Sequence, residues 1–302
     1  MVFRNADLPT LFHHADAVAI ARQREAVNTT RTQLLLLVAG AALAAPGWQG
    51  EPSGPERVLS ALSVLAYAGA LATSYLANRR RAKSHWQLNR SAAEFIKSLC
   101  WRYAVHGAPF GTASAHPEAL FAARLEEGLQ ELRKVGWSDP RESLAEAADD
   151  SDGVITDSMR MLRAKSFGVR RDTYVRDRLI EQRKWYHRRR EVSRRASALW
   201  SAAIALCTVL ALLFGLLHTF GTAGPVHVAG TLSAAAAACI AWSEMRRHQP
   251  LLSAHSLVEK DLEAMQVAME TSITERQWPS AVFETERLCS PQHTDWLAKL
   301  GT

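Results

Sequence analysis

Three long runs of the chain contain no Asp, Glu, Lys or Arg, although charged residues make up 22% of the sequence. These runs are residues 32–50, 58–78 and 196–243. A helix needs about 20 mostly apolar residues to cross a bilayer. The third run is too long for one such helix and is interrupted near residues 218–225 by two glycines and a proline. The pattern therefore predicts four transmembrane helices, at about residues 32–48, 58–78, 196–218 and 225–243.

The remaining segments show helical periodicity, and none alternates long enough to predict a strand. Residues 117–135 and 253–276 are expected to form amphipathic helices, and residues 154–165 a shorter one. Residues 79–104 are expected to continue the second span, and residues 171–195 to run as one helix into the third. We therefore expect an all-α, multi-pass membrane protein, with four transmembrane helices as two hairpins and long helices extending into the cytoplasm.

Basic residues occur at one end of each predicted span, whereas the two hairpin loops hold only Arg57. Because Lys and Arg are enriched on the cytoplasmic side, we expect the inner cell membrane, with both termini cytoplasmic. Basic residues beside a span also meet anionic lipid headgroups, at about 1 kcal/mol each. The candidates for headgroup contact are Arg79, Arg80, Arg81, Arg188, Arg189, Arg190, Arg194 and Arg195.

Topology also accounts for much of the net charge of +6. Residues 184–195 combine a dense basic cluster with Trp185 and Tyr186, a composition that nucleic-acid-binding segments share. The cluster directly precedes a predicted span, which favours membrane anchoring. We therefore expect a bilayer with anionic lipids as partner, and no nucleic acid.

The order of segments repeats once along the chain, as a basic helix, a hairpin of two spans and a cytoplasmic helix. We expect two units, residues 1–152 and 153–302, with both hairpins in the same orientation. Small residues recur every four positions in two spans, which lets helix backbones approach closely. They pack either within the chain or between protomers of a homo-oligomer, and the residues are Gly69, Thr73, Ala77, Gly230, Ala234 and Ala238.

The sequence contains no phosphate-binding loop, dinucleotide fingerprint, zinc-protease motif or nucleophile elbow. The histidines form no tight ligand pair, and the cysteines form no CxxC motif. The carboxylate clusters at residues 126–127, 149–150 and 284–286 are expected on solvated surfaces. We therefore expect no catalytic residues, no metal and no cofactor, and we do not expect an enzyme.

Three segments of the second half carry a family resemblance: residues 155–163 (ITDSMRMLR), 174–178 (YVRDR) and 182–186 (QRKWY), which lead into two spans. The openings at residues 7–12 (DLPTLF) and 21–24 (ARQR) extend it to the first half. Together these segments resemble the SLATT family, the SMODS- and SLOG-associating two-transmembrane effector domains of bacteria, in a form with two hairpins.

The resemblance implies an effector of a nucleotide-signalled conflict or anti-phage system that forms an oligomeric pore or perturbs the membrane. It also implies a nucleotide second messenger or a sensor protein as partner, and it carries over no catalytic residue. The residues that match the family pattern either pack the cytoplasmic helix against a neighbour or line a ligand pocket. They are Arg163, Tyr174, Arg178, Trp185 and Tyr186.

Two alternatives remain open from the sequence. One is a constitutive ion channel, although no predicted span holds an interior charge of the kind that proton pumps and voltage sensors need. The other is a non-conducting membrane scaffold that recruits a partner through residues 117–135 and 253–276.

Overall fold

The computed structural model describes residues 2–44, 54–80, 82–141, 154–220, 226–246 and 248–289. Within these ranges the chain forms helices, and they contain no strand. The residues group into two compact units that alternate along the sequence. Unit 1 comprises Met1–Arg22, Lys83–Arg189 and Ala254–Thr302, and unit 2 comprises Gln23–Ala82 and Arg190–Ser253.

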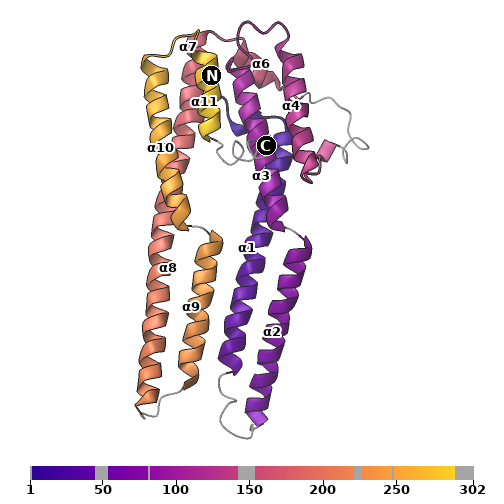
Figure 1. The fold of residues 1–302 in the computed structure, drawn as a ribbon. Coiled ribbons are helices and arrows are strands. Elements are labelled where there is room, and N and C mark those ends of the chain that lie inside the picture. Colours follow the sequence, from indigo (N-terminus) through magenta and orange to yellow (C-terminus); the bar gives the residue numbers. More distant parts are fainter. Residues whose placement is uncertain are drawn as a thin grey trace. The chain divides into compact units, whose positions relative to one another are not determined.

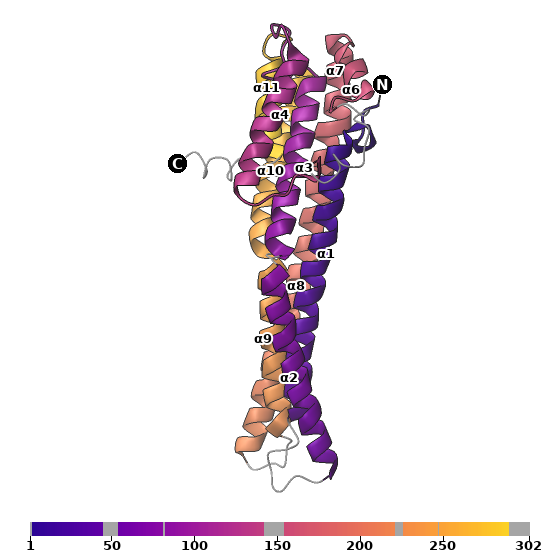
Figure 2. The ribbon, with the colours of Figure 1, turned by 90° about the vertical axis from the view of Figure 1, so that its right-hand side faces the viewer.

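Four long helices supply unit 2: α1 (Thr10–Ala44), α2 (Gly54–Arg80), α8 (Glu181–Thr219) and α9 (Val226–Arg246). Within this unit, α1 lies beside α2 and α8 lies beside α9 (Figure 1, Figure 2). Two of these helices, α1 and α8, begin in unit 1 and continue into unit 2 without a break. The chain thus passes between the units inside continuous helices.

The predicted all-α membrane architecture is confirmed. Among the residues that the structure describes, three segments are long and apolar enough to cross a membrane, and they lie within Gly54–Ala104, Phe167–Thr219 and Val228–Arg246. The remaining predicted span, residues 32–48, is the first along the chain. It begins inside α1, which is not among the three segments, and residues 45–48 lie outside the described part of the chain.

Unit 2 keeps small side chains inside and large apolar ones outside. Ser63, Ala66 and Ala70 form the buried face of α2, and the Ser63 hydroxyl donates to the backbone oxygen of Gly40 on α1 at 2.8 Å. On α8, by contrast, large aliphatic side chains such as Leu206 remain 60% exposed. This is the arrangement of helices whose outer surface is covered by lipid, where small residues allow close backbone approach.

Unit 1 is built from the beginnings of α1 and α8 together with shorter helices. These are the 3₁₀ turn η1 (Asn5–Asp7), α3 (Ala82–Ala104), α4 (Pro117–Lys134), α6 (Asp157–Arg163), α7 (Phe167–Tyr174), the π-helix η3 (Val175–Ile180), α10 (His248–Thr271) and α11 (Trp278–Cys289).

Local sequence explains where several of these helices begin. Pro117 starts α4, where its missing N–H costs nothing. Thr156 caps α6 by accepting a hydrogen bond from the backbone N–H of Met159. The buried face of α4 follows the predicted helical spacing, at Phe121, Leu125, Leu129 and Leu132.

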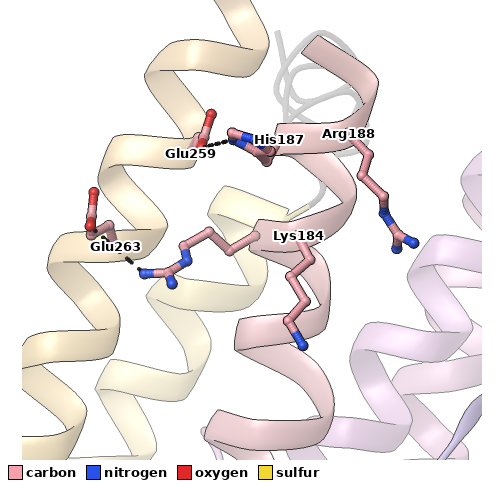
Figure 3. A pocket seen from close by; sticks show the side chains of 6 residues that line it. Lys184, His187, Arg188, Glu259 and Glu263 are labelled. Carbon is pink, nitrogen blue, oxygen red and sulfur yellow. Dashed lines mark hydrogen bonds and ion pairs between the residues drawn. The ribbon is translucent and has the colours of Figure 1, made fainter. Parts of the chain in front are cut away.

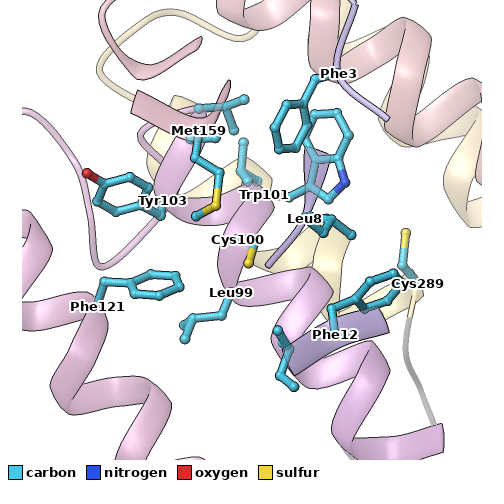
Figure 4. Close-up of a cluster of buried hydrophobic side chains, with 14 of the residues drawn as sticks. Phe3, Leu8, Phe12, Leu99, Cys100, Trp101, Tyr103, Phe121, Met159 and Cys289 are labelled. Atoms are coloured by element: carbon cyan, nitrogen blue, oxygen red, sulfur yellow. The ribbon is translucent and has the colours of Figure 1, made fainter. Parts of the chain in front are cut away.

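The largest fully buried side chains in the core of unit 1 are aromatic, and several of them are drawn in Figure 4. Trp101 packs edge-on against Phe3 at 4.7 Å and against Tyr174 at 5.7 Å between ring centroids. Tyr174 in turn meets Trp278 of α11 at 5.7 Å. The chain of rings joins the N-terminal segment, α3, α7 and α11, and edge-to-face pairs add about 0.5–1.5 kcal/mol each beyond their burial.

The helices differ from the sequence-based expectation at three places. Residues 171–195 do not form one α-helix, because the π-helix η3 separates α7 from α8. The expected helix at residues 253–276 begins earlier and ends earlier, as α10. Helix α11 was not predicted, although it supplies Trp278 and Val282 to the core.

Candidate functional site

The residues that carry the family pattern lie on α6, α7, η3 and the first turns of α8, all within unit 1. In η3, Val175, Arg178 and Leu179 are buried. Buried arginine is rare unless its charge is paired. The residue that pairs with Arg178 therefore shows which part of the protein η3 contacts.

Arg178 forms a buried ion pair with Glu286 of α11, and only 2% and 1% of the two side chains are exposed. Its Nη2 donates to Oε2 at 2.7 Å and its Nε to Oε1 at 3.0 Å. The Tyr174 hydroxyl donates to Oε1 at 2.9 Å. Burial acts against the charged form of Arg178, but the Glu286 carboxylate outweighs it and raises the arginine pKa well above its usual value. Glu286 thus ties α7 and η3 to α11.

Two other residues of the pattern also hold segments together. The Arg163 guanidinium donates to the backbone oxygens of Tyr103 at 2.6 Å and Phe110 at 3.0 Å, and it lies over the Tyr103 ring. The Tyr186 hydroxyl donates to the backbone oxygen of Cys289 at 3.1 Å. Arg163, Tyr174 and Tyr186 therefore all contact other segments of unit 1.

Trp185 is the exception among these residues, because 42% of it is exposed. Together with Arg178, it lines an open cleft of about 790 Å³ in unit 1. We call this the α3–α8 cleft; besides residues of η1 and α1, its walls include Arg90, Glu94 and Lys97 of α3, and Arg178, Trp185 and Arg188 of η3 and α8. Its volume lies within the range of small-molecule sites, about 300–1,000 Å³.

A smaller hollow lies between α8 and α10 (Figure 3). Here His187 pairs with Glu259 at 2.9 Å and Arg183 with Glu263 at 3.8 Å. Arg188 points away from both glutamates in this view (Figure 3). Ion pairs that connect the two helices therefore line the hollow, and Arg188 is the lining residue here for which no ion pair is formed in the described part of the chain.

Two family models match the chain. SMODS and SLOG-associating 2TM effector domain 3 matches residues 9–171, and SMODS and SLOG-associating 2TM effector domain 1 matches residues 174–296. The first match alone covers more than half of the 302 residues. The chain belongs to the SLATT family. No curated protein and no solved structure matches it.

The two SLATT matches meet near the end of α7, between residues 171 and 174. Each match contributes helices to both compact units. The α3–α8 cleft therefore takes one wall from each SLATT domain, with α1 and α3 from the first and η3 and α8 from the second. The boundary predicted at residues 152–153 lies outside the described residues.

The candidate headgroup residues of this SLATT protein are in different settings. Arg80 pairs with Glu25 at 3.2 Å, and Arg194 with Glu191 at 2.9 Å. Arg188 lines the α3–α8 cleft. Arg189 and Arg190 also have interactions within the protein. Arg79 and Arg195 are exposed, and Arg81 lies outside the described residues.

The small residues of the spans divide in a similar way. A Cβ at Gly69 would lie 3.3 Å from Leu36 of α1, so this glycine packs within the SLATT chain. The Thr73 hydroxyl donates to the backbone oxygen of Ala70 in its own helix, and Ala77 is half-buried. On α9, Ala234 and Ala238 are half-buried, whereas a Cβ at Gly230 would have no atom within 4 Å.

Glu286 is 2% exposed, so the prediction that it lies on a solvated surface is wrong. The spacing of Trp278, Val282, Glu286 and Cys289 could have indicated one buried helical face. Lys97 and Glu94 carried no separate signal, since any helix surface includes such residues. In the described part of the chain, no group of three or more His, Cys, Asp or Glu side chains could hold a metal ion.

Proposed function

We propose that this SLATT protein is a membrane effector that assembles as a homo-oligomer in the inner membrane and permeabilises it in response to a signal received by unit 1. The signal is a nucleotide second messenger or a sensor protein, and the response needs no catalysis. Anionic lipids surround the spans, and both termini are cytoplasmic. Membership of the SLATT family supports the effector class. We add to it that the protein forms an oligomer, that the oligomer forms a pore, and that a signal opens this pore.

One observation carries the proposal: α8 is a single helix with one end in unit 1 and the other in an apolar span. Its first turns line the α3–α8 cleft. No residue described in its most apolar stretch is buried within the chain. Since exposed apolar surface of this extent requires lipid or protein to cover it, α8 supports both membrane insertion and contact between copies.

The test is release of ions and of a dye from liposomes that contain the full chain, with and without added nucleotides. Protease protection of the cytoplasmic helices establishes correct insertion. We expect release only when a signal is present. Release without any addition would instead indicate the constitutive channel, and no release from correctly inserted protein would indicate the scaffold.

A pair of glycine variants tests the oligomer. Gly230→Leu adds bulk to an exposed position of α9 where the single chain has open space, so we expect the fold to persist while cross-linked oligomers and dye release decrease. Gly168→Leu makes the same change at an equally open position on α7, outside the spans, and should leave both readouts unchanged. Equal behaviour of the two variants would contradict a protomer contact at Gly230.

A further inference from the structure

Two basic side chains that line the α3–α8 cleft, Lys97 and Arg188, form no ion pair within the described part of the chain. The four carboxylates of the cleft are paired with other basic residues: Asp16 and Glu94 share Arg90, Asp177 pairs with Arg176, and Glu181 pairs with Lys184. Lys97 and Arg188 differ, because no carboxylate oxygen in the described part of the chain lies within ion-pair distance of either. An anion that entered the cleft would meet two cationic side chains that have no ion-pair partner in the described part of the chain.

The surroundings of Lys97 make its ammonium group lose a proton more easily than an exposed lysine does. Burial and the positive charge of Arg178 lower its pKa to about 8, against the opposing effect of Glu94 and Glu286. Arg90 of the same helix adds to the lowering, and Arg4, Asp16 and Glu181 line the same cleft. A ligand phosphate beside Lys97 would favour its charged form, since an opposite charge at close range stabilises an ammonium group.

Two further groups of the cleft offer contacts to a ligand: Glu94, and Trp185, which packs edge-on against Tyr186 and His255 but stays 42% exposed. Glu94 Oε2 is buried and has no hydrogen-bond donor in the part of the chain that the structure describes. Trp185 presents an aromatic surface at the same wall as Arg188, three residues further along α8. A hydroxyl or amino group would satisfy the first, and a flat ring would stack on the second.

We infer that the α3–α8 cleft binds a nucleotide, with its phosphates at Lys97 and Arg188, its base on Trp185 and a hydroxyl or amino group at Glu94. The inference deepens the proposed function, since it makes the nucleotide the signal. The bound phosphates join α3 of the first SLATT domain to α8 of the second. Ligand binding would therefore act directly on the helix that continues into the membrane span.

The first experiment measures binding to the full chain in detergent micelles, with ATP as probe, by calorimetry. Lys97→Met should weaken ATP binding at least tenfold, whereas Lys260→Met removes an exposed lysine of α10 that does not line the cleft, and it should change nothing. Between about pH 7 and about pH 9 the affinity of the unmodified protein should fall about tenfold as Lys97 loses its proton. Lys97→Arg keeps its charge at both pH values and should abolish this pH dependence.

A second arm separates the phosphate contacts from the ring contact. Pyrophosphate has phosphates but no base, so it should bind more weakly than ATP. Trp185→Leu should weaken ATP binding about tenfold, as expected for loss of base stacking, and leave pyrophosphate binding unchanged. Equal losses for both probes would contradict a base on Trp185.

A third arm tests a lipid headgroup as the source of the phosphate. Vesicles of phosphatidylglycerol, compared with phosphatidylcholine, should not compete with ATP. Competition, no binding of ATP at about millimolar concentration, or unchanged affinity in Lys97→Met would overturn the inference.

The binding assay and the release assay can refute the nucleotide site and the gated pore separately. ATP binding that depends on Lys97 but causes no dye release would leave the site standing and remove the gated pore. Nucleotide-triggered release that persists in Lys97→Met would support the gated pore and contradict the nucleotide site at Lys97.

Discussion

Unit 1 and unit 2 are both helical, but their side chains are sorted in opposite ways. Unit 1 buries its largest residues, including Trp101, Tyr174 and Trp278, around a buried ion pair. Unit 2 buries small residues such as Ser63 and Ala70 and exposes large aliphatic ones. Unit 1 therefore carries its own hydrophobic core, whereas unit 2 depends on lipid or other copies to cover its surface.

The largest expected effect tests the buried charge in unit 1. Glu286→Gln leaves Arg178 buried without a counter-charge, which should lower the free energy of unfolding by about 3–5 kcal/mol. Glu284→Gln, two residues away on α11, breaks an exposed pair with Arg287 and should cost no more than about 1 kcal/mol. Denaturant unfolding of the full chain in micelles, followed by near-ultraviolet circular dichroism, measures both.

Equal stability of these two variants would remove the contrast, because unit 1 would then gain nothing from its buried polar network. Glu286→Gln should leave the far-ultraviolet helical signal of the spans in place, since their helices are held by lipid-like surroundings and by backbone hydrogen bonds. Loss of both signals together would mean that the two units unfold as one.

The sequence predicted unit 2 better than unit 1 for a physical reason. A long charge-free run is the local composition that a membrane span requires, so three of the four predicted spans overlap apolar segments of the structure. The helix at residues 117–135 was also predicted, because its apolar spacing is local, and the structure confirms it as α4.

Unit 1 depends on partners that are distant in sequence. Arg178 and Glu286 are 108 residues apart, and nothing local distinguishes the buried Glu286 from the exposed Glu284. The cleft is harder still to predict, because the important property of Lys97 and Arg188 is a missing carboxylate partner. The sequence indicates only a role in topology and headgroup contact for Arg188. The structure adds that Arg188 lines the same cleft as residues of α3.

A smaller effect is expected from packing density in unit 1. A Cβ at Gly107 would lie 2.6 Å from Val282, which is fully buried on α11, and 3.2 Å from the backbone of Arg102. Gly107→Ala should therefore lower stability by about 1–3 kcal/mol. Gly168→Ala has open space and a helical position, so it should stabilise by up to about 1 kcal/mol. Thermal unfolding of both variants gives the comparison, and a neutral Gly107→Ala would show that unit 1 is less tightly packed at α11.

Acid should lower the stability of unit 1 through protonation of His106. Burial and the positive charges of Arg163 and Arg170 lower the pKa of His106 to about 4. The unfolded chain therefore binds this proton first, and stability should fall as the pH drops from about 6.5 towards about 4, by up to about 1.4 kcal/mol per pH unit. His106 has a positive φ of 62°, which asparagine tolerates. His106→Asn should flatten this part of the pH profile; an unchanged slope would assign the acid sensitivity to other groups.

The smallest expected effect lies in unit 2. Ser63→Ala removes the hydrogen bond from α2 to the backbone oxygen of Gly40 on α1, and such bonds between membrane helices contribute about 0.6 kcal/mol on average. Ser233→Ala is the matched control, because that hydroxyl bonds to Ala229 within its own helix at 2.9 Å. Stability in bicelles should differ between the two by only a few tenths of a kcal/mol. A loss of several kcal/mol in Ser63→Ala would mean that unit 2, like unit 1, relies on specific buried polar contacts, and the contrast between small residues under lipid and a self-sufficient aromatic core would no longer hold.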